Sequence, residues 1–144
     1  MEITDITEEV RATGMGSLCA RMGIDLQSAE LSDKGWASVT GTMPVEGNTQ
    51  PYGLLHGGAN AVLAESLGSI ASGITAHTLN GEGHIVVGVD LNCTHHRAAR
   101  EGVVTGSARL ISVGRTVISS HIEIFDHQGT LICTSRLTCL VRKM

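Results

Sequence analysis

The chain has 144 residues and a formal net charge of −4 at pH 7, with 42% hydrophobic and 17% charged residues. This length suits one ordinary domain, and the apolar content excludes a disordered chain. A general nucleic-acid binder needs a basic surface, and a single-strand binder needs several aromatic rings on which bases stack. The acidic charge and the aromatic content of 2% therefore argue against nucleic acid as a partner.

The cysteines and the N-terminus carry no metal, redox or targeting pattern. None of the four cysteines belongs to a C-x-x-C pair, and no H-E-x-x-H motif occurs. The run MEITDITEEV has neither the basic nor the apolar part of a secretory signal, and no uncharged run is apolar enough to span a bilayer. We therefore expect a cytoplasmic protein with reduced cysteines, no metal and no membrane segment.

The predicted elements begin with a helix over residues 6–22. Two glutamates near its start suit the positive end of a helix dipole, and Gly23 can end it. We therefore assign residues 1–29 to an N-terminal helical segment. The next run, WASVTGTM at 36–43, has the β-branched content of a strand, and a loop rich in Gly, Pro and Asn follows it.

A long amphipathic helix is predicted over residues 57–79. Apolar side chains recur there at spacings of three and four, which places them on one helix face: Ala59, Val62, Leu63, Leu67, Ile70, Ala71 and Ile74. The Asn80-Gly81 pair then ends the pattern.

Four long runs rich in Val, Ile and Thr follow this helix: 84–96, 102–113, 115–126 and 130–142. They predict a four-strand antiparallel meander over 84–142, which the strand at 36–43 can join. Because the apolar face of such a sheet must be covered, the helix at 57–79 is expected to pack on it. The predicted fold class is α+β, in a single domain over residues 1–144.

One acidic residue stands alone in the central helix. Between residues 47 and 81, Glu65 is the only Asp, Glu, Lys or Arg. Helical offsets of four and seven place it beside Ala61, Ser69 and Ser72, on a small polar face that a ligand or a second subunit can approach closely. The alternative is that Glu65 faces bulk solvent, although such a helix side usually carries several charges. We predict a functional carboxylate.

A double glycine precedes the central helix in the run QPYGLLHGG. Free N–H groups at a helix start point outward and carry partial positive charge, so they can hold a carbonyl oxygen or an oxyanion. Glycine lets a substrate approach the backbone, and His56 and Gln50 supply further donors. By itself, H-G-G is equally compatible with a Gly-rich turn and a structural histidine. The motif gains weight from its spacing to Gln50 and Glu65.

The run QPYGLLHGG, followed by AVLAESLGS, resembles the hotdog-fold acyl-CoA thioesterases, in particular their aryl-acyl-CoA branch, which acts on 4-hydroxybenzoyl-CoA or 1,4-dihydroxy-2-naphthoyl-CoA. The runs VGVDLNCTHHRAAREG and HIEIFDHQGTLICTSRLT extend this resemblance, which covers residues 30–142. It implies a curved antiparallel sheet wrapped around a long central helix. It also implies homodimers, paired into homotetramers, with active sites at the subunit interface.

The resemblance also implies roles for individual residues. Glu65 matches the catalytic carboxylate, a nucleophile or a general base that the second subunit supplies across the interface. Gly57 matches the residue whose backbone N–H binds the thioester oxygen, and Gln50 and His56 match residues that orient and polarise the thioester. Ser69 matches a position that lines the acyl pocket.

A basic cluster at the end of the 84–96 run suits phosphate, because arginine offers forked donors. In the resembling enzymes, the positions of His95 and Arg97 lie toward the nucleotide end of coenzyme A, and Arg115 is a further candidate. The alternative is a solvated strand end with ordinary surface charge.

The predicted reaction is the hydrolysis of an acyl-CoA to a free acid and CoA. A thioester carbonyl is electrophilic and a thiolate leaves readily, so no cofactor is expected beyond the CoA within the substrate. An acyl or aryl carrier protein is a further candidate partner. Two alternatives stay open: a hotdog 3-hydroxyacyl dehydratase or hydratase, and a non-catalytic module that binds acyl-CoA or acyl carrier protein.

Overall fold

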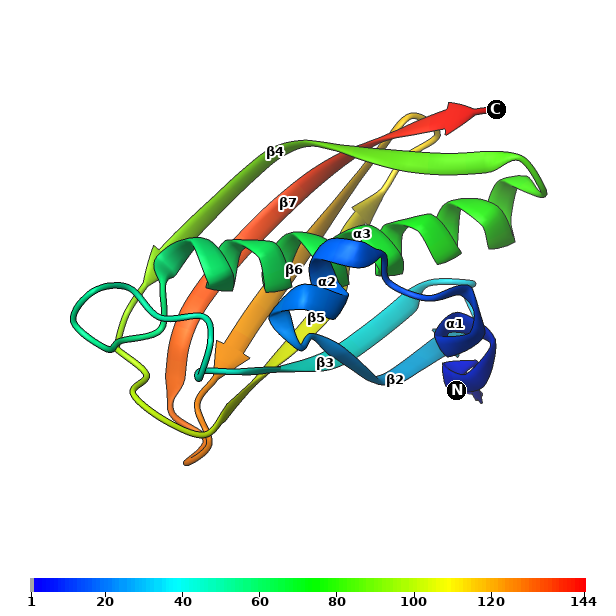
Figure 1. Ribbon diagram of the computed structural model, residues 1–144. Coiled ribbons are helices and arrows are strands. Elements are labelled where there is room, and N and C mark those ends of the chain that lie inside the picture. The colour runs from blue at the N-terminus through cyan, green and yellow to red at the C-terminus, as the bar shows by residue number, and fades with distance from the viewer. Residues whose placement is uncertain (1) are drawn as a thin grey trace.

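A computed structural model describes residues 2–144 of the chain. Its elements in chain order are β1 (Ile3–Asp5), α1 (Thr7–Thr13), α2 (Ser17–Met22), β2 (Asp25–Ser32), β3 (Ala37–Pro44), α3 (Gly57–Asn80), β4 (His84–His95), β5 (Val103–Val113), β6 (Val117–Phe125) and β7 (Leu131–Lys143). The strands form one antiparallel sheet in the order β1-β2-β3-β5-β6-β7-β4, and α3 lies across one face of it (Figure 1).

The predicted four-strand meander over 84–142 is wrong in its pairing. Only β5, β6 and β7 follow one another in the sheet, whereas β4 pairs with β7 and lies at the sheet edge. The alternation of polar and apolar residues tells which face of a strand is buried, but it does not tell which strands are neighbours. The β4–β5 connection is also longer than a hairpin turn, which leaves room for a crossover.

The predicted N-terminal helical segment is also corrected by the structure. Residues 6–22 form two short helices, because Gly14 and Gly16 adopt left-handed φ values of 81° and 88° between them. Gly23 ends α2 in the left-handed conformation, as expected. The strands β1 and β2 were not predicted. A register shift between Leu26 and Ser28 interrupts the alternation in β2 that would have indicated a strand.

The helix α3 packs closely against the sheet, and its range is one residue longer than predicted. Leu67 is fully buried, and its Cδ atoms lie 2.8 Å and 2.7 Å from the points where Cβ atoms on Gly41 and Gly106 would stand. Any side chain at these positions of β3 and β5 would push α3 outward. The sheet wraps around the helix, which contacts β3, β4, β5, β6 and β7.

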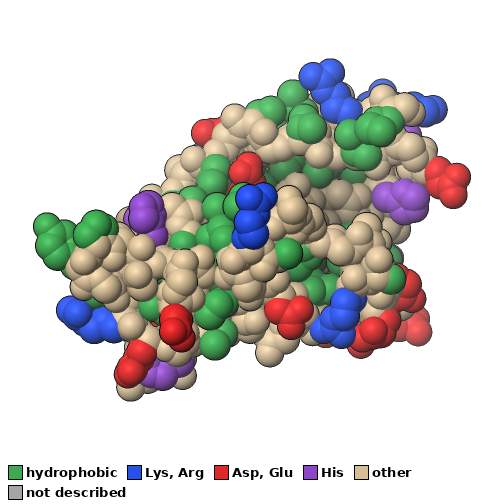
Figure 2. Space-filling view, in the orientation of Figure 1, with side chains coloured by type: hydrophobic (Ala, Val, Ile, Leu, Met, Phe, Trp, Pro, Cys, Tyr) green, Lys and Arg blue, Asp and Glu red, His purple; other side chains and the backbone are tan. Residues whose placement is uncertain are grey.

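The buried face of α3 differs from the predicted apolar stripe. Val62, Ile70 and Ile74 are only half-buried, whereas Ser72, which we expected beside Glu65 on an open polar face, is fully buried. The reason is that the wrapped sheet covers more than one side of the helix, and α2 contacts it as well. On the face shown in Figure 2, the Lys and Arg side chains are spread over separate places and form no continuous basic surface.

No helix within residues 2–144 is long and apolar enough to cross a membrane. The same residues contain no group of three or more His, Cys, Asp or Glu side chains that could hold a metal ion. All four cysteines are free, and Cys19, Cys133 and Cys139 are buried in the core.

Candidate active site at the start of the central helix

The first turn of α3 leaves one backbone donor free. His56 caps the helix, and its Nδ1 accepts a hydrogen bond from the Gly58 N–H at 2.8 Å. The His56 carbonyl accepts from Ala59 N–H at 2.9 Å and from Asn60 N–H at 3.3 Å. Within residues 2–144, the Gly57 N–H finds no acceptor. It therefore remains available at the positive end of the helix dipole.

The cap also fixes the protonation pattern of His56. A neutral imidazole whose Nδ1 accepts a hydrogen bond carries its proton on Nε2. The exposed ring can thus donate through Nε2 to a ligand. The structural and the functional interpretations of the H-G-G run are therefore compatible, because one ring nitrogen caps the helix and the other is free.

Gly57 lines a cavity of about 360 Å³ together with several of the other predicted residues. The cavity is lined by Gln50, Gly57, Asn60, His95 and Arg97, together with neighbouring residues of the two loops. Gln50 uses its side-chain oxygen inside its own loop, where it accepts from the Tyr52 and Leu54 N–H groups. Its amide nitrogen is left for a ligand. The fold thus brings together residues from two runs that are far apart in the sequence.

His95 lies against Gly57, the residue that carries the free donor. A Cβ atom on Gly57 would stand 3.0 Å from the Nε2 of His95, so any side chain there would force this ring to move by a few tenths of an ångström. The Nδ1 of the same ring lies 3.4 Å from the Nδ2 of Asn60. This places the imidazole beside the helix start, and its expected position toward the nucleotide end of coenzyme A stays a prediction.

Glu65 does not share this cavity within one chain. It follows Gly57 by eight residues (57 to 65) on the same helix, which is about 12 Å along the axis. Its side chain is exposed and lines a second cavity of about 380 Å³ together with Ser69 and Ile70. Its Oε1 lies 3.0 Å from the point where a Cβ on Gly88 of β4 would stand.

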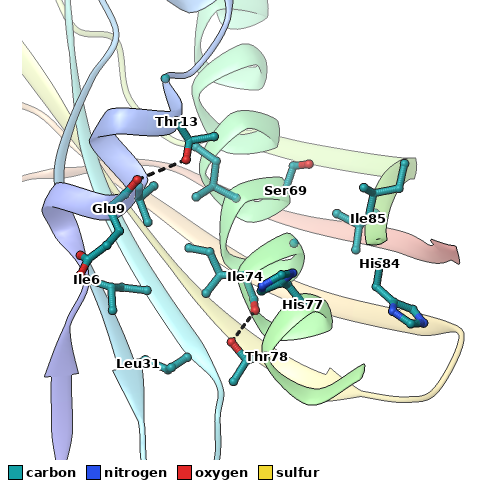
Figure 3. Close-up of a pocket in the computed structure, with 15 residues that line it drawn as sticks. Ile6, Glu9, Thr13, Leu31, Ser69, Ile74, His77, Thr78, His84 and Ile85 are labelled. Atoms are coloured by element: carbon teal, nitrogen blue, oxygen red, sulfur yellow. Dashed lines mark hydrogen bonds between the residues drawn. The ribbon is translucent and has the colours of Figure 1, made fainter. Parts of the chain in front are cut away.

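Ser69 lies between the Glu65 cavity and a larger one of about 670 Å³, because it lines both. The larger cavity is mostly apolar. Figure 3 shows Ile74 and His77 of α3 between α1 on one side and His84 and Ile85 at the start of β4 on the other. This cavity offers space for an apolar group that reaches past Ser69.

The predicted phosphate-binding residues are separated in one chain. Arg97 lines the cavity beside Gly57. It comes two residues after His95, which pairs with Cys133 near the start of β7. Arg115 lies in the β5–β6 turn, before Val117, which pairs with Leu140. Residues 133 and 140 are far apart along β7, so the two arginines lie at opposite ends of the sheet.

Asn60 is a polar residue of the site that sequence reasoning missed. It is 4% exposed, and its Oδ1 has no hydrogen-bond partner among the described residues. The only signal in the sequence is an amide three residues after Gly57, among mostly apolar residues of the same helix.

Comparisons with known proteins give a consistent result. The family model described as "Thioesterase superfamily" matches residues 52–133, which is more than half of the chain. The proofreading thioesterase EntH of Cronobacter turicensis is 42% identical over 135 residues, covering 93% of this chain and 92% of the relative. A putative esterase of Vibrio cholerae, VC_A0580, is 49% identical over 107 residues, covering 74% and 69%.

Two solved structures are similar over nearly the whole chain. The thioesterase HI1161 of Haemophilus influenzae has a TM-score of 0.84 and 34% identity, covering 97% of this chain and 92% of that one. A mutant of the thioesterase PA1618 of Pseudomonas aeruginosa has a TM-score of 0.83 and 37% identity, covering 96% and 94%.

Proposed function

The chain belongs to the thioesterase superfamily and has the hotdog fold, and on this premise we propose that it hydrolyses the thioester of an aryl-acyl-CoA. The observation that carries this proposal is the free N–H of Gly57, a residue that lines one cavity with Gln50 and Arg97. A backbone donor at a helix start suits the negative charge that develops on a thioester oxygen during hydrolysis.

The carboxylate that completes the site is proposed to come from a second copy of the chain. Glu65 and Gly57 of one chain are too far apart to act on a single carbonyl carbon. The strand β4 lies at the sheet edge, and its outer face exposes Ile85, Val87 and Val89. Since an open apolar edge favours pairing with another strand, we expect β4 to pair antiparallel with β4 of a second copy.

The contacts of β4 suggest the register of this pairing. Glu65 lies against Gly88, and Gly57 lies against His95. The ladder between β4 and β7 skips one residue between Gly88 and Asp90, which marks a β-bulge. An antiparallel pair centred near Asn92, with this bulge included, would put Gly88 of one strand opposite His95 of the other. Glu65 of one copy would then meet Gly57 of its partner, and a dimer would hold two sites.

The proposed reaction uses these residues, the substrate and one water molecule. The Gly57 N–H holds the thioester oxygen, while Gln50 Nε2 and the Nε2–H of His56 orient the thioester. Glu65 then either attacks the carbonyl carbon, expelling CoA thiolate and leaving a mixed anhydride that water hydrolyses, or removes a proton from the attacking water. Both routes release one carboxylic acid and one CoA.

The substrate is proposed from the two flanking cavities. The apolar cavity beyond Ser69 suits an aromatic acyl group. Arg97 suits the phosphates of coenzyme A, and the antiparallel pairing would bring Arg115 of the second copy to the same end. A carrier-protein thioester presents the same group around its sulfur, so an acyl or aryl carrier protein is a second candidate partner. The relative EntH is named a proofreading thioesterase.

A thiol-release assay over aryl and alkyl CoA esters tests the proposal. We expect Glu65→Gln to abolish turnover while acyl-CoA binding persists, and Glu46→Gln, an exposed glutamate outside the site, to behave like the wild type. Binding of acyl-CoA without thiol release by the wild type would instead indicate a binding module. Hydration of an enoyl-CoA without thiol release would indicate a hydratase.

A further inference from the structure

We infer that His95 is a second donor to the thioester oxygen and that Asn60 positions its ring. This inference rests on the thioesterase function proposed above and adds two residues to its carbonyl-binding site. His95 would be a catalytic residue, because it touches the reacting oxygen. Asn60 would be a positioning residue, because it acts through His95.

The contact between Asn60 and His95, with the amide nitrogen facing the ring, favours one position for the ring proton. An amide nitrogen can only donate a hydrogen bond, so the Nδ1 of His95, 3.4 Å from Asn60 Nδ2, must accept it. The neutral ring therefore carries its proton on Nε2. Asn60 itself is held by α3 one turn after Gly57 and is 4% exposed, so its amide is a fixed reference point for the ring.

The protonated nitrogen lies at the helix start. His95 Nε2 stands 3.0 Å from the point where a Cβ on Gly57 would be, and the N–H of this glycine is free. Two donors, one from the backbone and one from a side chain, thus belong to neighbouring residues that line one cavity. Fixed donors that converge on one oxygen are the arrangement that stabilises a tetrahedral oxyanion.

The buried Oδ1 of Asn60 lacks a hydrogen-bond partner among the described residues, as do the hydroxyls of Ser72 and Ser120, but only Asn60 of the three lines this cavity. Buried polar atoms are nearly always paired in folded proteins. A ligand N–H or a water molecule that enters the cavity would supply the missing donor.

The neighbouring histidine provides a contrast on the same strand end. The Nε2 of His96 contacts the hydroxyl of Thr134 at 2.8 Å and takes no part in the contact with Gly57. Only His95 of the His95-His96 pair therefore reaches the helix start. Arg97 remains the candidate for the phosphates, so the cluster would divide between polarising the carbonyl and binding the nucleotide.

Kinetics of His95 and Asn60 variants test the inference. We expect His95→Ala to lower kcat by about 100-fold with little change in KM, as for the loss of one oxyanion donor. His95→Gln, which keeps an N–H donor, should recover part of that loss. Asn60→Ala should lower kcat by a smaller factor. The control is His121→Gln, in which the altered side chain lies on the outer face of β6 and should not affect kcat.

Nitrogen-15 NMR of the histidine rings measures which ring nitrogen of His95 is protonated. This tautomer should not change if Asn60 serves only to stabilise the fold. At a pH above about 8, where histidine is neutral, His95 of the wild type should show a protonated Nε2 and an unprotonated Nδ1. Asn60→Ala should convert this to a mixture of tautomers. The His95→Ala spectrum identifies the signals. This measurement needs no turnover, and the His95 tautomer can be read from the folded protein even if Asn60→Ala is less stable.

The outcomes separate this inference from the proposed function. Normal thiol release by His95→Ala, or a proton on Nδ1 of His95 in the wild type, would overturn the inference and leave the thioesterase intact. Absence of thiol release by the wild type on every ester would overturn both.

Discussion

The carboxylate of Glu65 rests on Gly88, with Oε1 3.0 Å from the point where a Cβ on that glycine would stand. The strand β4 thereby sets the position of the proposed catalytic group. The same strand carries His95, which lies against Gly57. Both halves of the proposed site therefore depend on the position of one strand. Small changes along β4 should affect activity without affecting the core.

Gly88→Val should displace the Glu65 carboxylate. A branched side chain suits a strand, so we expect the protein to fold, but the carboxylate must shift and kcat should fall by about 100-fold. Val103→Thr, at an exposed valine of β5 outside the site and outside the proposed β4 pairing, is the matched control and should retain kcat. Steady-state thiol release and circular dichroism measure the two effects. Unchanged kcat in Gly88→Val would mean that the position of Glu65 is not critical.

Gly57→Ala should inactivate the site while the helix stays intact. Alanine is a better helix former than glycine, so the melting temperature should not fall. The added Cβ would stand 3.0 Å from His95 Nε2, so the ring would have to shift and the carbonyl-binding site would change shape. We expect kcat/KM to drop by about 100-fold in the thiol-release assay. Retention of wild-type activity would contradict the role proposed for the Gly57 N–H.

His56 should show two separable effects. His56→Ala removes the acceptor of the Gly58 N–H, which should cost about 1 kcal/mol of unfolding free energy, and it also removes the Nε2 donor. His56→Asn restores a cap but not that donor. We therefore expect Asn at this position to recover stability in urea unfolding, while kcat stays low. Full recovery of kcat would show that His56 acts only as a cap.

The sequence predicted the elements near the site better than their arrangement. The long period-3.6 pattern gave α3 to within one residue, because nothing interrupts it. The alternating pattern of the strands did not predict the edge position of β4, because strand order depends on contacts between distant segments. Gly14 and Gly16 split the N-terminal helix at positions where glycine would also be compatible with a continuous helix.

The site was predicted in part for a similar reason. Local motifs identified Gln50, Gly57 and Arg97, and the fold brings them to one cavity. Asn60 had no local signal, because its importance comes from the ring of His95 across the cavity. The pairing of Glu65 with Gly57 needs a second chain, so no feature within one chain can establish it.

Stability should decline at alkaline pH because of two core thiols. Burial raises the pKa of the Cys133 and Cys139 thiols above the ordinary value of 9.0. Above that pH the unfolded chain loses these protons while the folded chain keeps them, so the free energy of unfolding falls as pH rises. Urea unfolding between about pH 8 and 10 should show a shallower decline for a Cys133→Ala, Cys139→Ala double variant. Equal slopes would contradict this assignment.

A disulfide cross-link tests the proposed pairing of β4 with a second copy. In an antiparallel pair centred near Asn92, the two Asn92 Cα atoms would lie about 4.5 to 5.5 Å apart, which is within reach of a disulfide. Asn92→Cys should therefore form a covalent dimer under mild oxidation, and it should keep its activity. Thr94→Cys, on the same exposed face, would be about 13 Å from its symmetry mate and should not cross-link. Non-reducing electrophoresis, with the wild type as a control for the native cysteines, measures both. Cross-linking of Thr94→Cys but not Asn92→Cys would place the axis elsewhere on β4 and separate Glu65 from the Gly57 N–H of the partner.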